Sequence, residues 1–302
     1  MKALQFAEYG DPEVMHVVAV EEPHAGPGQI RIAVRAAGVN PVDWKIRSGL
    51  LRGMMPVALP CIPGSDVAGV VDEVGDQTTG VSVGDEVFGF AIGGGSAQYA
   101  LLEHFAAKPS AMSWAEAAGL PVAVETATRA LNLLGVAEGH TLLVNGAAGG
   151  VGAATVQLAL ARGAQVIGTA SEGNHEFLRS LGVTPTTYGD GLVQRVRAIA
   201  PDGPDLALDI AGRGALPDLI EITGGADRVV TIADYEAPKY GVRLTSGGEG
   251  RAFQALAQAA QLFEQGRFSL PVARTYALAD AHQAHRTSEE GHVRGKLVLL
   301  ID

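Results

Sequence analysis

A glycine-rich turn between an apolar strand and a helix constrains the fold of this chain more than any other feature. The strand is expected over residues 141–145, and the letters GAAGGVG follow it at residues 146–152. A helical stretch over 149–162 comes next, and a second apolar segment covers 164–170. A glycine turn in this order of strand, turn, helix and strand is typical of the phosphate-binding turn of a parallel sheet.

The chemistry of such a turn predicts a dinucleotide site. Glycines let a pyrophosphate approach the backbone, and the helix that follows offers free N–H groups and the positive end of its dipole. In the register G-x-G-x-x-G the first position is Ala147, whereas Gly149 and Gly152 occupy the other two. A tight structural turn without a ligand is the alternative, but the flanking strands and helix favour the dinucleotide site. The expected pyrophosphate contacts are Ala148, Gly149, Gly150, Val151 and Gly152.

The end of the second strand predicts which dinucleotide binds. Sites for NAD usually carry an Asp or Glu there, which binds the ribose 2′-hydroxyl. In this chain the corresponding residue, Ala170, is not acidic. Ser171 could donate a hydrogen bond to a 2′-phosphate, and His175 lies just beyond it. Glu172 is acidic and would favour NAD(H), unless it only stabilises the first turn of the following helix. We therefore expect NADP(H) rather than NAD(H) as the cofactor.

The pattern of expected strands and helices along the sequence predicts two domains. Residues 30–36 alternate between apolar and polar, and further short strands cut by Gly and Pro follow, which indicates a barrel-like β module. From about residue 125, strands alternate with helices, and a last long helix is expected over 251–265. That alternation is typical of a doubly wound parallel sheet. The expected fold class is α/β, with one domain of residues 1–122 and 267–302 and another of residues 123–266.

Composition narrows the function classes. The formal charge is −11, and the chain has no basic run, so nucleic acid is not an expected partner. The N-terminus lacks an apolar leader and no stretch of 18 apolar residues occurs, so a cytoplasmic protein without a membrane span is expected. The one cysteine, Cys61, is expected to be a small buried apolar residue rather than a nucleophile.

Five motifs in a fixed order resemble a known family. They are NPVD at 40–43, PGSDVAG at 63–69, GDEVFG at 84–89, AAGGVG at 147–152 and GKLVL at 295–299. Their order resembles the medium-chain dehydrogenase/reductase superfamily, and within it the zinc-independent, ζ-crystallin-like quinone oxidoreductases. The resemblance covers essentially the whole chain. It implies a GroES-like β-barrel catalytic domain, a Rossmann nucleotide-binding domain inserted before the last strands, an NADPH-linked reductase activity and a homodimer.

The resemblance also implies roles for single residues. Asn40 matches an asparagine near the nicotinamide, and Thr126 matches a threonine at the inner end of the cofactor. Tyr188 matches a tyrosine that helps to hold the 2′-phosphate, and His175 stands where this branch often has lysine. Lys45 falls where some relatives have a tyrosine that faces the substrate. Asn40 and Lys45 are therefore the expected catalytic residues.

The sequence does not supply the ligands of a zinc alcohol dehydrogenase. Zinc sites of that kind need Cys or His side chains, whereas Asn40 and Ser65 stand near the ligand positions here. His282 and His285 form an i,i+3 pair, but no third ligand has an evident place beside them, so a solvated helix face is expected. No metal is expected.

These observations predict an NADPH-dependent reductase of quinones or of activated, α,β-unsaturated carbonyl double bonds that works without metal. An enoyl reductase of polyketide-type secondary metabolism would use the same fold and cofactor. A nucleotide-binding sensor or structural protein without turnover is the alternative of another class. Oxidation of NADPH by a small-molecule acceptor would separate these possibilities.

Overall fold

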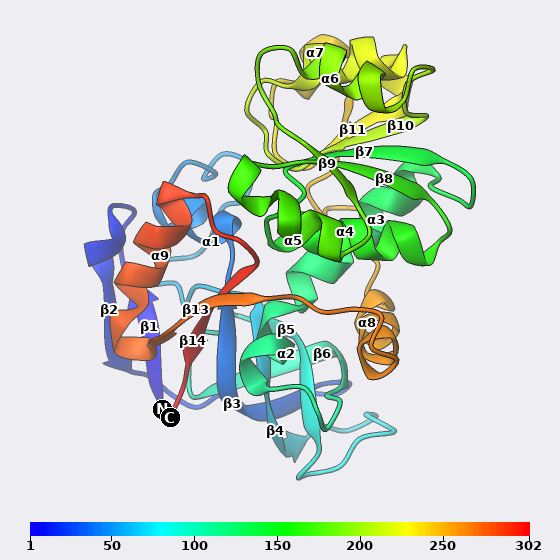
Figure 1. The fold of residues 1–302 in the computed structure, drawn as a ribbon. Helices are drawn as coiled ribbons and strands as arrows, with labels where there is room; N and C mark the ends of the chain where they lie inside the picture. The colour runs from blue at the N-terminus through cyan, green and yellow to red at the C-terminus, as the bar shows by residue number, and fades with distance from the viewer. The chain divides into compact units, whose positions relative to one another are not determined.

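The computed structural model describes residues 1–302 and divides the chain into two compact units (Figure 1). One unit is Met1–Val122 with Leu256–Asp302, and the other is Ala123–Ala255. The second domain was expected to end at residue 266, whereas this division groups nearly all of helix α8 (Ala255–Glu264) with the first unit.

The first unit is built on a sheet that closes on itself. Its six strands pair in the order β13-β14-β3-β4-β5-β6, and β3 also pairs with β6. Strands β3 to β6 therefore form a closed ring, which confirms the expected barrel. Strands β1 and β2 form a separate antiparallel pair. The strands of this unit are β1 (Lys2–Phe6), β2 (Met15–Ala19), β3 (Ile30–Val39), β4 (Asp66–Val74), β5 (Glu86–Ile92), β6 (Tyr99–Ala107), β13 (Val272–Ala277) and β14 (Lys296–Leu300).

The alternating sequence of β3 explains its central place. Ile30, Ile32 and Val34 are buried in the barrel core, as the period of two in a half-buried strand requires. Strand β3 pairs with β4 along almost its whole length, whereas its first residues pair with β6 and its last residues pair with β14. One strand thus links segments from both ends of the chain.

Four helices belong to the first unit: α1 (Pro41–Arg47), α2 (Trp114–Gly119), α8 and α9 (Ala281–Glu290). A capping box begins α2, since the Ser113 hydroxyl accepts the Glu116 N–H at 3.2 Å and Glu116 accepts the Ser113 N–H at 2.9 Å. Helix α9 packs against α1 (Figure 1). The fully buried Arg47 joins the two helices through Glu289, at 2.9 Å.

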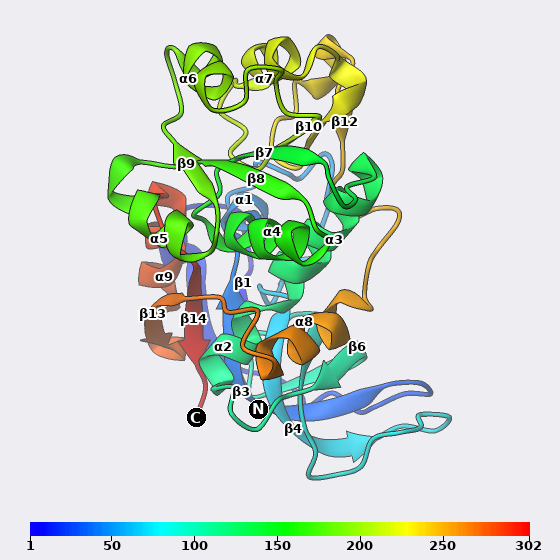
Figure 2. The same ribbon diagram turned by 45° about the vertical axis from the view of Figure 1, so that its right-hand side comes forward.

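The second unit is a parallel sheet with helices on both faces. Its order is β12-β11-β10-β7-β8-β9, with every pair parallel. The chain winds outward from β7 in one direction and then in the other, which is the doubly wound topology expected. Helices α4 and α5 cover one face, and α6 and α7 cover the other (Figure 2). The strands are β7 (Thr141–Asn145), β8 (Gln165–Thr169), β9 (Thr184–Thr186), β10 (Leu206–Asp209), β11 (Val229–Thr231) and β12 (Arg243–Leu244). The helices are α3 (Pro121–Leu134), α4 (Gly150–Ala161), α5 (His175–Ser180), α6 (Leu192–Ile199) and α7 (Leu216–Thr223).

The central helix of this unit packs closely on the sheet. All residues from Gly152 to Ala159 in α4 are buried, so the helix is apolar on all sides rather than amphipathic. Gly168 in β8 has no side chain, which leaves space for Ala147 in the turn before α4. A Cβ at Gly168 would lie 2.8 Å from the Cβ of Ala147 and 2.9 Å from Cγ1 of Val183. The small residues of the motif therefore set how closely the turn approaches the sheet.

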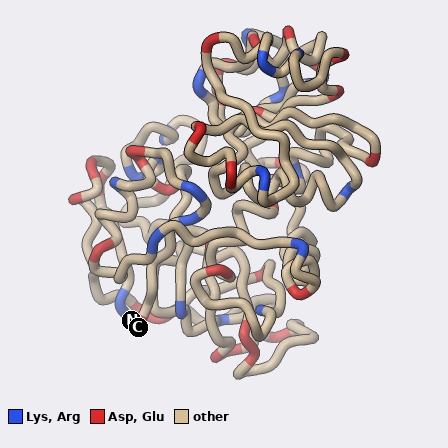
Figure 3. Tube along the Cα trace, in the orientation of Figure 1, with Lys and Arg blue, Asp and Glu red and all other residues tan.

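Charge is distributed over both units. Figure 3 shows Lys and Arg positions interspersed with Asp and Glu along the trace. The chain has 22 basic and 33 acidic residues. None of the helices has both the length and the apolar character that crossing a lipid bilayer requires.

Candidate functional site

The glycine turn begins at the carboxyl end of β7 and is tied to β8. Gly146 has a φ of +91°, a left-handed conformation that glycine adopts without strain. Its N–H donates to the Thr169 hydroxyl at 3.1 Å, and the Ala147 N–H donates to the Thr169 carbonyl at 3.0 Å. Two consecutive hydrogen bonds thus fix the turn against the neighbouring strand before α4 starts.

The N-terminus of α4 has the donors that a pyrophosphate needs. Gly149 is the N-cap, so the N–H groups of Gly150, Val151 and Gly152 have no acceptor within the helix. Gly149, Gly150 and Val151 are half-buried rather than covered by the core. A Cβ at Gly152 would lie 2.1 Å from the Gly146 carbonyl oxygen, so glycine is required where helix and turn cross. The residues present fit the phosphates of a dinucleotide.

A buried side-chain network joins four strands at the same edge of the sheet. The Thr169 hydroxyl donates to Asn145 Oδ1 at 2.7 Å, and Asn145 Nδ2 donates to Asp209 Oδ1 at 2.9 Å. The Thr231 hydroxyl donates to Asp209 Oδ2 at 2.8 Å. These four residues end β8, β7, β10 and β11 and are at most 3% exposed. No motif in the sequence pointed to them.

The network also holds the loops that follow β10 and β11. Asp209 Oδ1 accepts the N–H groups of residues 211 and 212 at 3.2 and 3.1 Å. The Thr231 hydroxyl accepts those of residues 233 and 234 at 3.2 and 3.0 Å. The carboxyl ends of β7 and β10 mark the point where the sheet order reverses, which is where open α/β sheets bind ligands. The backbone around this point is therefore fixed by side chains.

The residues expected at a 2′-phosphate follow two adjacent strands. Ser171 comes after β8 and Tyr188 after β9, and these strands are parallel neighbours. Both side chains are exposed, Tyr188 by 53%. His175 Nε2 lies 3.3 Å from the Ala170 carbonyl oxygen. When Nε2 carries the hydrogen of that contact, Nδ1 is the ring atom left for another partner.

Arg195 fixes the turn that carries Tyr188. Its guanidinium donates to the carbonyl oxygens of Thr187 at 3.0 Å and Gly189 at 3.1 Å, and to that of Asp190 at 2.6 Å. Its hydrogens are thus used on the backbone, which gives Arg195 a structural role at this edge. The sequence offered no signal for it beyond its place on a helix after the turn.

Thr126 lies in a buried charged group on α3. Its hydroxyl is 3.4 Å from Glu125 Oε2. Glu125 Oε1 accepts from Arg129 Nε at 2.9 Å and from the Ala252 N–H at 3.1 Å. Arg129 also donates to the Thr245 hydroxyl. Thr126, the residue expected at the inner end of the cofactor, is 9% exposed and contacts the charged side chains of Glu125 and Arg129.

In the first unit, Asn40 is the centre of a buried polar cluster. Its backbone N–H donates to Asp43 Oδ2 at 2.7 Å, as in a capping box at the start of α1. Its Nδ2 donates to Asp66 Oδ2 at 2.9 Å, and its Oδ1 accepts from the ammonium of Lys296. Asn40 itself is 3% exposed. Both ends of its amide are thus held by charged groups.

Asp66 and Lys296 carry this cluster from opposite ends of the chain. They form an ion pair of 3.2 Å between buried side chains, and Asp66 Oδ1 accepts the Val122 N–H at 2.8 Å. Burial raises the pKa of Asp43 to about 7, and the neighbouring Asp66 carboxylate acts in the same direction. A protonated Asp43 leaves one ammonium facing one carboxylate. The signal in the sequence was a charged residue at the start of each of two apolar strands.

Lys45 and Cys61 were the other reactive side chains considered in this unit. Lys45 is on α1 with its ammonium 5.8 Å from the ring centroid of Trp44, and burial lowers its pKa. The lysine whose contact with Asn40 is defined is Lys296. Cys61 is half-buried, and burial raises the pKa of its thiol, which keeps the less nucleophilic protonated form.

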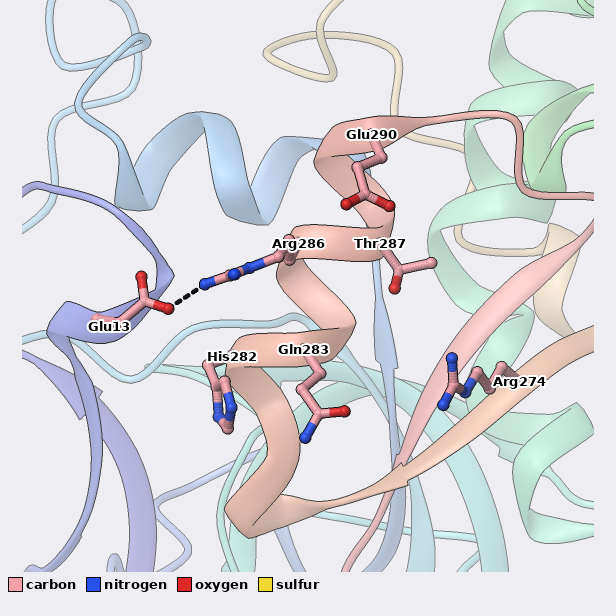
Figure 4. A pocket seen from close by; sticks show the side chains of 7 residues that line it. All are labelled: Glu13, Arg274, His282, Gln283, Arg286, Thr287 and Glu290. Carbon is pink, nitrogen blue, oxygen red and sulfur yellow. Dashed lines mark hydrogen bonds and ion pairs between the residues drawn. The ribbon is translucent and has the colours of Figure 1, made fainter.

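The two histidines of α9 were expected on a solvated helix face, and for His285 that expectation was wrong. His285 is 1% exposed and its Nδ1 has no partner. His282 instead lines a surface hollow of about 370 Å³ beside Arg274 and Arg286 (Figure 4). Arg286 pairs with Glu13 across this hollow. Charged, exposed walls of this kind do not resemble an apolar substrate pocket.

Comparison with known proteins agrees with this geometry. The model of the alcohol dehydrogenase GroES-like domain matches residues 26–121, and the zinc-binding dehydrogenase model matches residues 181–299. Quinone oxidoreductase from Mus musculus is 32% identical, with 100% of this chain and 98% of that protein covered. 2-Methylene-furan-3-one reductase from Solanum lycopersicum is 37% identical over 82% of this chain and 66% of its own length.

This chain belongs to the quinone oxidoreductase-like branch of the medium-chain dehydrogenase/reductase superfamily.

Solved structures show the same likeness for this quinone oxidoreductase-like chain. The quinone oxidoreductase from Coxiella burnetii has a TM-score of 0.86 at 30% identity, covering 100% of this chain and 99% of that one. CurK enoyl reductase has a TM-score of 0.89 at 26% identity, covering 100% and 99%. Mycobacterial Rv1454c, solved in complex with NADPH, has a TM-score of 0.82 at 27% identity and covers 99% of both chains.

One of the matching family models is described as zinc-binding, but this quinone oxidoreductase-like chain has no group of three or more His, Cys, Asp or Glu side chains that could hold a metal ion. Asn40 and Ser65 stand near the positions of zinc ligands, but Asn40 donates to Asp66 and Ser65 precedes β4. Amide and hydroxyl groups are poor substitutes for the thiolates and imidazoles of such sites.

Proposed function

We propose that the chain is an NADPH-dependent reductase of quinones and α,β-unsaturated carbonyl compounds that works without a metal. The observation that carries this proposal is the nucleotide edge of the second unit. It combines free N–H groups at Gly150 and Val151 with a strand end that has no acidic residue at Ala170. Ser171 follows directly and His175 lies four residues further on, and both offer donors for a 2′-phosphate.

In this proposal each part of the chain has a defined task. The N–H groups at the start of α4 bind the pyrophosphate, and Ser171, His175 and Tyr188 bind the 2′-phosphate. The reduced nicotinamide supplies a hydride when the cofactor is bound. Asn40 and Lys45 donate hydrogen bonds to the acceptor oxygen, on which negative charge grows. The second hydrogen of the reduced product enters as a proton from solvent.

The names of the similar proteins support this assignment. They include quinone oxidoreductases, a furanone reductase and a protein solved with NADPH. An enoyl reductase is the second candidate, because CurK enoyl reductase shares the fold at a TM-score of 0.89. We further propose a homodimer, as the resemblance to this branch implies.

The test is a screen of cofactor oxidation. Loss of NADPH absorbance is followed with a quinone, an enone, an enoyl thioester and, as a control, a saturated aldehyde. We expect turnover of the quinone or the enone and none of the aldehyde. Turnover of the thioester alone would favour the enoyl reductase. Binding of NADPH without oxidation by any acceptor would contradict the reductase and favour a nucleotide sensor.

Cofactor choice is tested in the same protein by fluorescence titration. NADPH should bind more tightly than NADH by roughly 1–3 kcal/mol, because only NADPH presents a phosphate to Ser171 and His175. Equal dissociation constants would contradict the assignment of this strand end. Such a result would not contradict the proposed reductase activity, which is tested separately.

A further inference from the structure

The Asn40 side chain has one more hydrogen-bond donor than the protein uses. Its Nδ2 carries two hydrogens, and Asp66 Oδ2 accepts one of them. Its Oδ1 is occupied by the Lys296 ammonium. A reversed amide would place its NH₂ group against the ammonium and its oxygen against the carboxylate. The two partners therefore fix which way the amide faces, and with it the direction of the second N–H.

Lys296 also changes the strength of that donor. A cation at the amide oxygen draws electron density from the nitrogen, so the remaining N–H becomes more positive and a better donor. Asp66 balances the charge of Lys296 at 3.2 Å without using the second hydrogen. Both side chains are buried, at 5% and 0% exposure, so solvent screens these interactions little. The cluster is built to polarise one amide.

We propose that Lys296 and Asp66 are positioning residues, which orient and polarise Asn40 so that its second amide N–H donates to the carbonyl oxygen of the acceptor. This inference rests on the proposed reductase function and deepens it, because it names the groups that would meet the carbonyl oxygen conjugated to the reducible double bond. Hydride from the reduced cofactor forms a C–H bond at the β-carbon. The π electrons then shift to the oxygen as an enolate, where the N–H meets the charge. A proton from solvent at the α-carbon completes the saturated carbonyl product.

The first test replaces Lys296 and uses a matched lysine as a control. Lys108 is also buried in the first unit, at 4% exposure, and it contacts Glu86 at 2.8 Å but not Asn40. Lys296→Met should lower kcat for an enone about tenfold or more, since a transition-state donor is weakened. The NADPH dissociation constant should stay the same in this variant. Lys108→Met should change kcat by no more than about twofold. Equal losses in both variants would overturn the proposal.

A double-mutant cycle separates positioning from structure. If Lys296 acts through Asn40, Lys296→Met should cost little further activity in an Asn40→Ala background. If the fall in kcat of the double variant equals the product of the falls in the two single variants, Lys296 acts elsewhere and the proposal is overturned. Lys296→Met leaves Asp66 buried without its ion pair, which can itself impair folding. The charge-neutral double variant Lys296→Met, Asp66→Asn is therefore measured as well. Wild-type kcat in that folded variant would also contradict the role of the pair.

The outcomes also distinguish this inference from the proposed function. If none of the acceptors supports oxidation of NADPH by the wild-type chain, the reductase assignment fails and the double-mutant cycle has no activity to compare. If the wild type reduces enones while Lys296→Met does so equally well, only the positioning role fails.

Discussion

At the scale of single residues, His285, with Arg47 on the neighbouring helix, shows how burial sets the charge of a histidine. They lie on the packed helices α9 and α1, and both are nearly or fully buried. Burial lowers the pKa of His285 to about 3, with the Arg47 guanidinium acting in the same direction. The imidazole is therefore neutral in the folded protein across the whole neutral and mildly acidic range.

This neutral histidine predicts a specific acid sensitivity. Below about pH 6.5 the unfolded chain binds a proton at His285 that the folded chain binds only near pH 3, so the free energy of unfolding falls as pH falls through this window. At pH 5 the loss relative to pH 7 should be about 2 kcal/mol from this residue. Urea unfolding of the wild type and of His285→Gln at both pH values measures it.

The variant should lose less stability on acidification than the wild type does, because the titrating group is gone. His282→Gln, in the half-buried histidine of the same helix, is the matched control and should follow the wild type. Parallel losses in the wild type and in His285→Gln would contradict the assignment.

At the scale of elements, the glycines at the start of α4 differ in how much space a side chain would have. A Cβ at Gly152 would lie 2.1 Å from the Gly146 carbonyl oxygen and 2.7 Å from the Ala147 carbonyl carbon. A Cβ at Gly149 would meet that same oxygen only at 3.9 Å. Neither position has a left-handed backbone, so space alone separates them.

The pair Gly152→Ala and Gly149→Ala therefore gives a clear prediction. Gly152→Ala should push helix and turn apart, weaken NADPH binding at least tenfold by about 1.4 kcal/mol or more, and lower the melting temperature. Gly149→Ala should lower the melting temperature much less, because its Cβ has room and the change costs only the preference of an N-cap for glycine over alanine. Titration of NADPH fluorescence and a thermal melt measure both. Wild-type affinity in Gly152→Ala would mean that the turn does not need this close crossing.

Elements were easier to predict from the sequence than the partners of buried charges. The glycine turn between a strand and a helix and the alternation in β3 are local patterns, and both were confirmed. The helix expected from residue 251 instead starts at Ala255, and the Ala252 N–H before it donates to Glu125 on α3. Lys296 meets Asn40 across 256 positions of sequence, and no local pattern encodes such a contact.

At the scale of the whole molecule, each unit depends on segments that are far apart in sequence. The barrel unit needs both β3 and the late strand β14, and its polar cluster needs Lys296 at the start of that strand. Truncating the chain before β14 would therefore remove a barrel strand and the cation at Asn40 together. The return of the tail to the first module was predicted from the sequence, but no function was predicted for Lys296.

Assembly and metal content are the predictions that belong to the whole chain. Light scattering after gel filtration should give twice the mass of the 31.1 kDa chain if the proposed homodimer forms. Elemental analysis of the same peak should find no stoichiometric zinc, and a chelator should leave kcat unchanged, because no group of three metal-binding side chains exists. A peak at the mass of a single chain would contradict the dimer. One tightly held zinc per chain would contradict the metal-free mechanism.

The network from Thr169 to Thr231 also has a consequence for amide hydrogen exchange. The N–H groups of residues 146, 211, 212, 233 and 234 are bonded to its side chains rather than to a ladder or helix. Their protection against deuterium therefore depends on the Asp209 carboxylate and on the hydroxyls of Thr169 and Thr231. Loops that are distant along the chain should open to solvent together, as one cooperative patch along the carboxyl edge of the sheet.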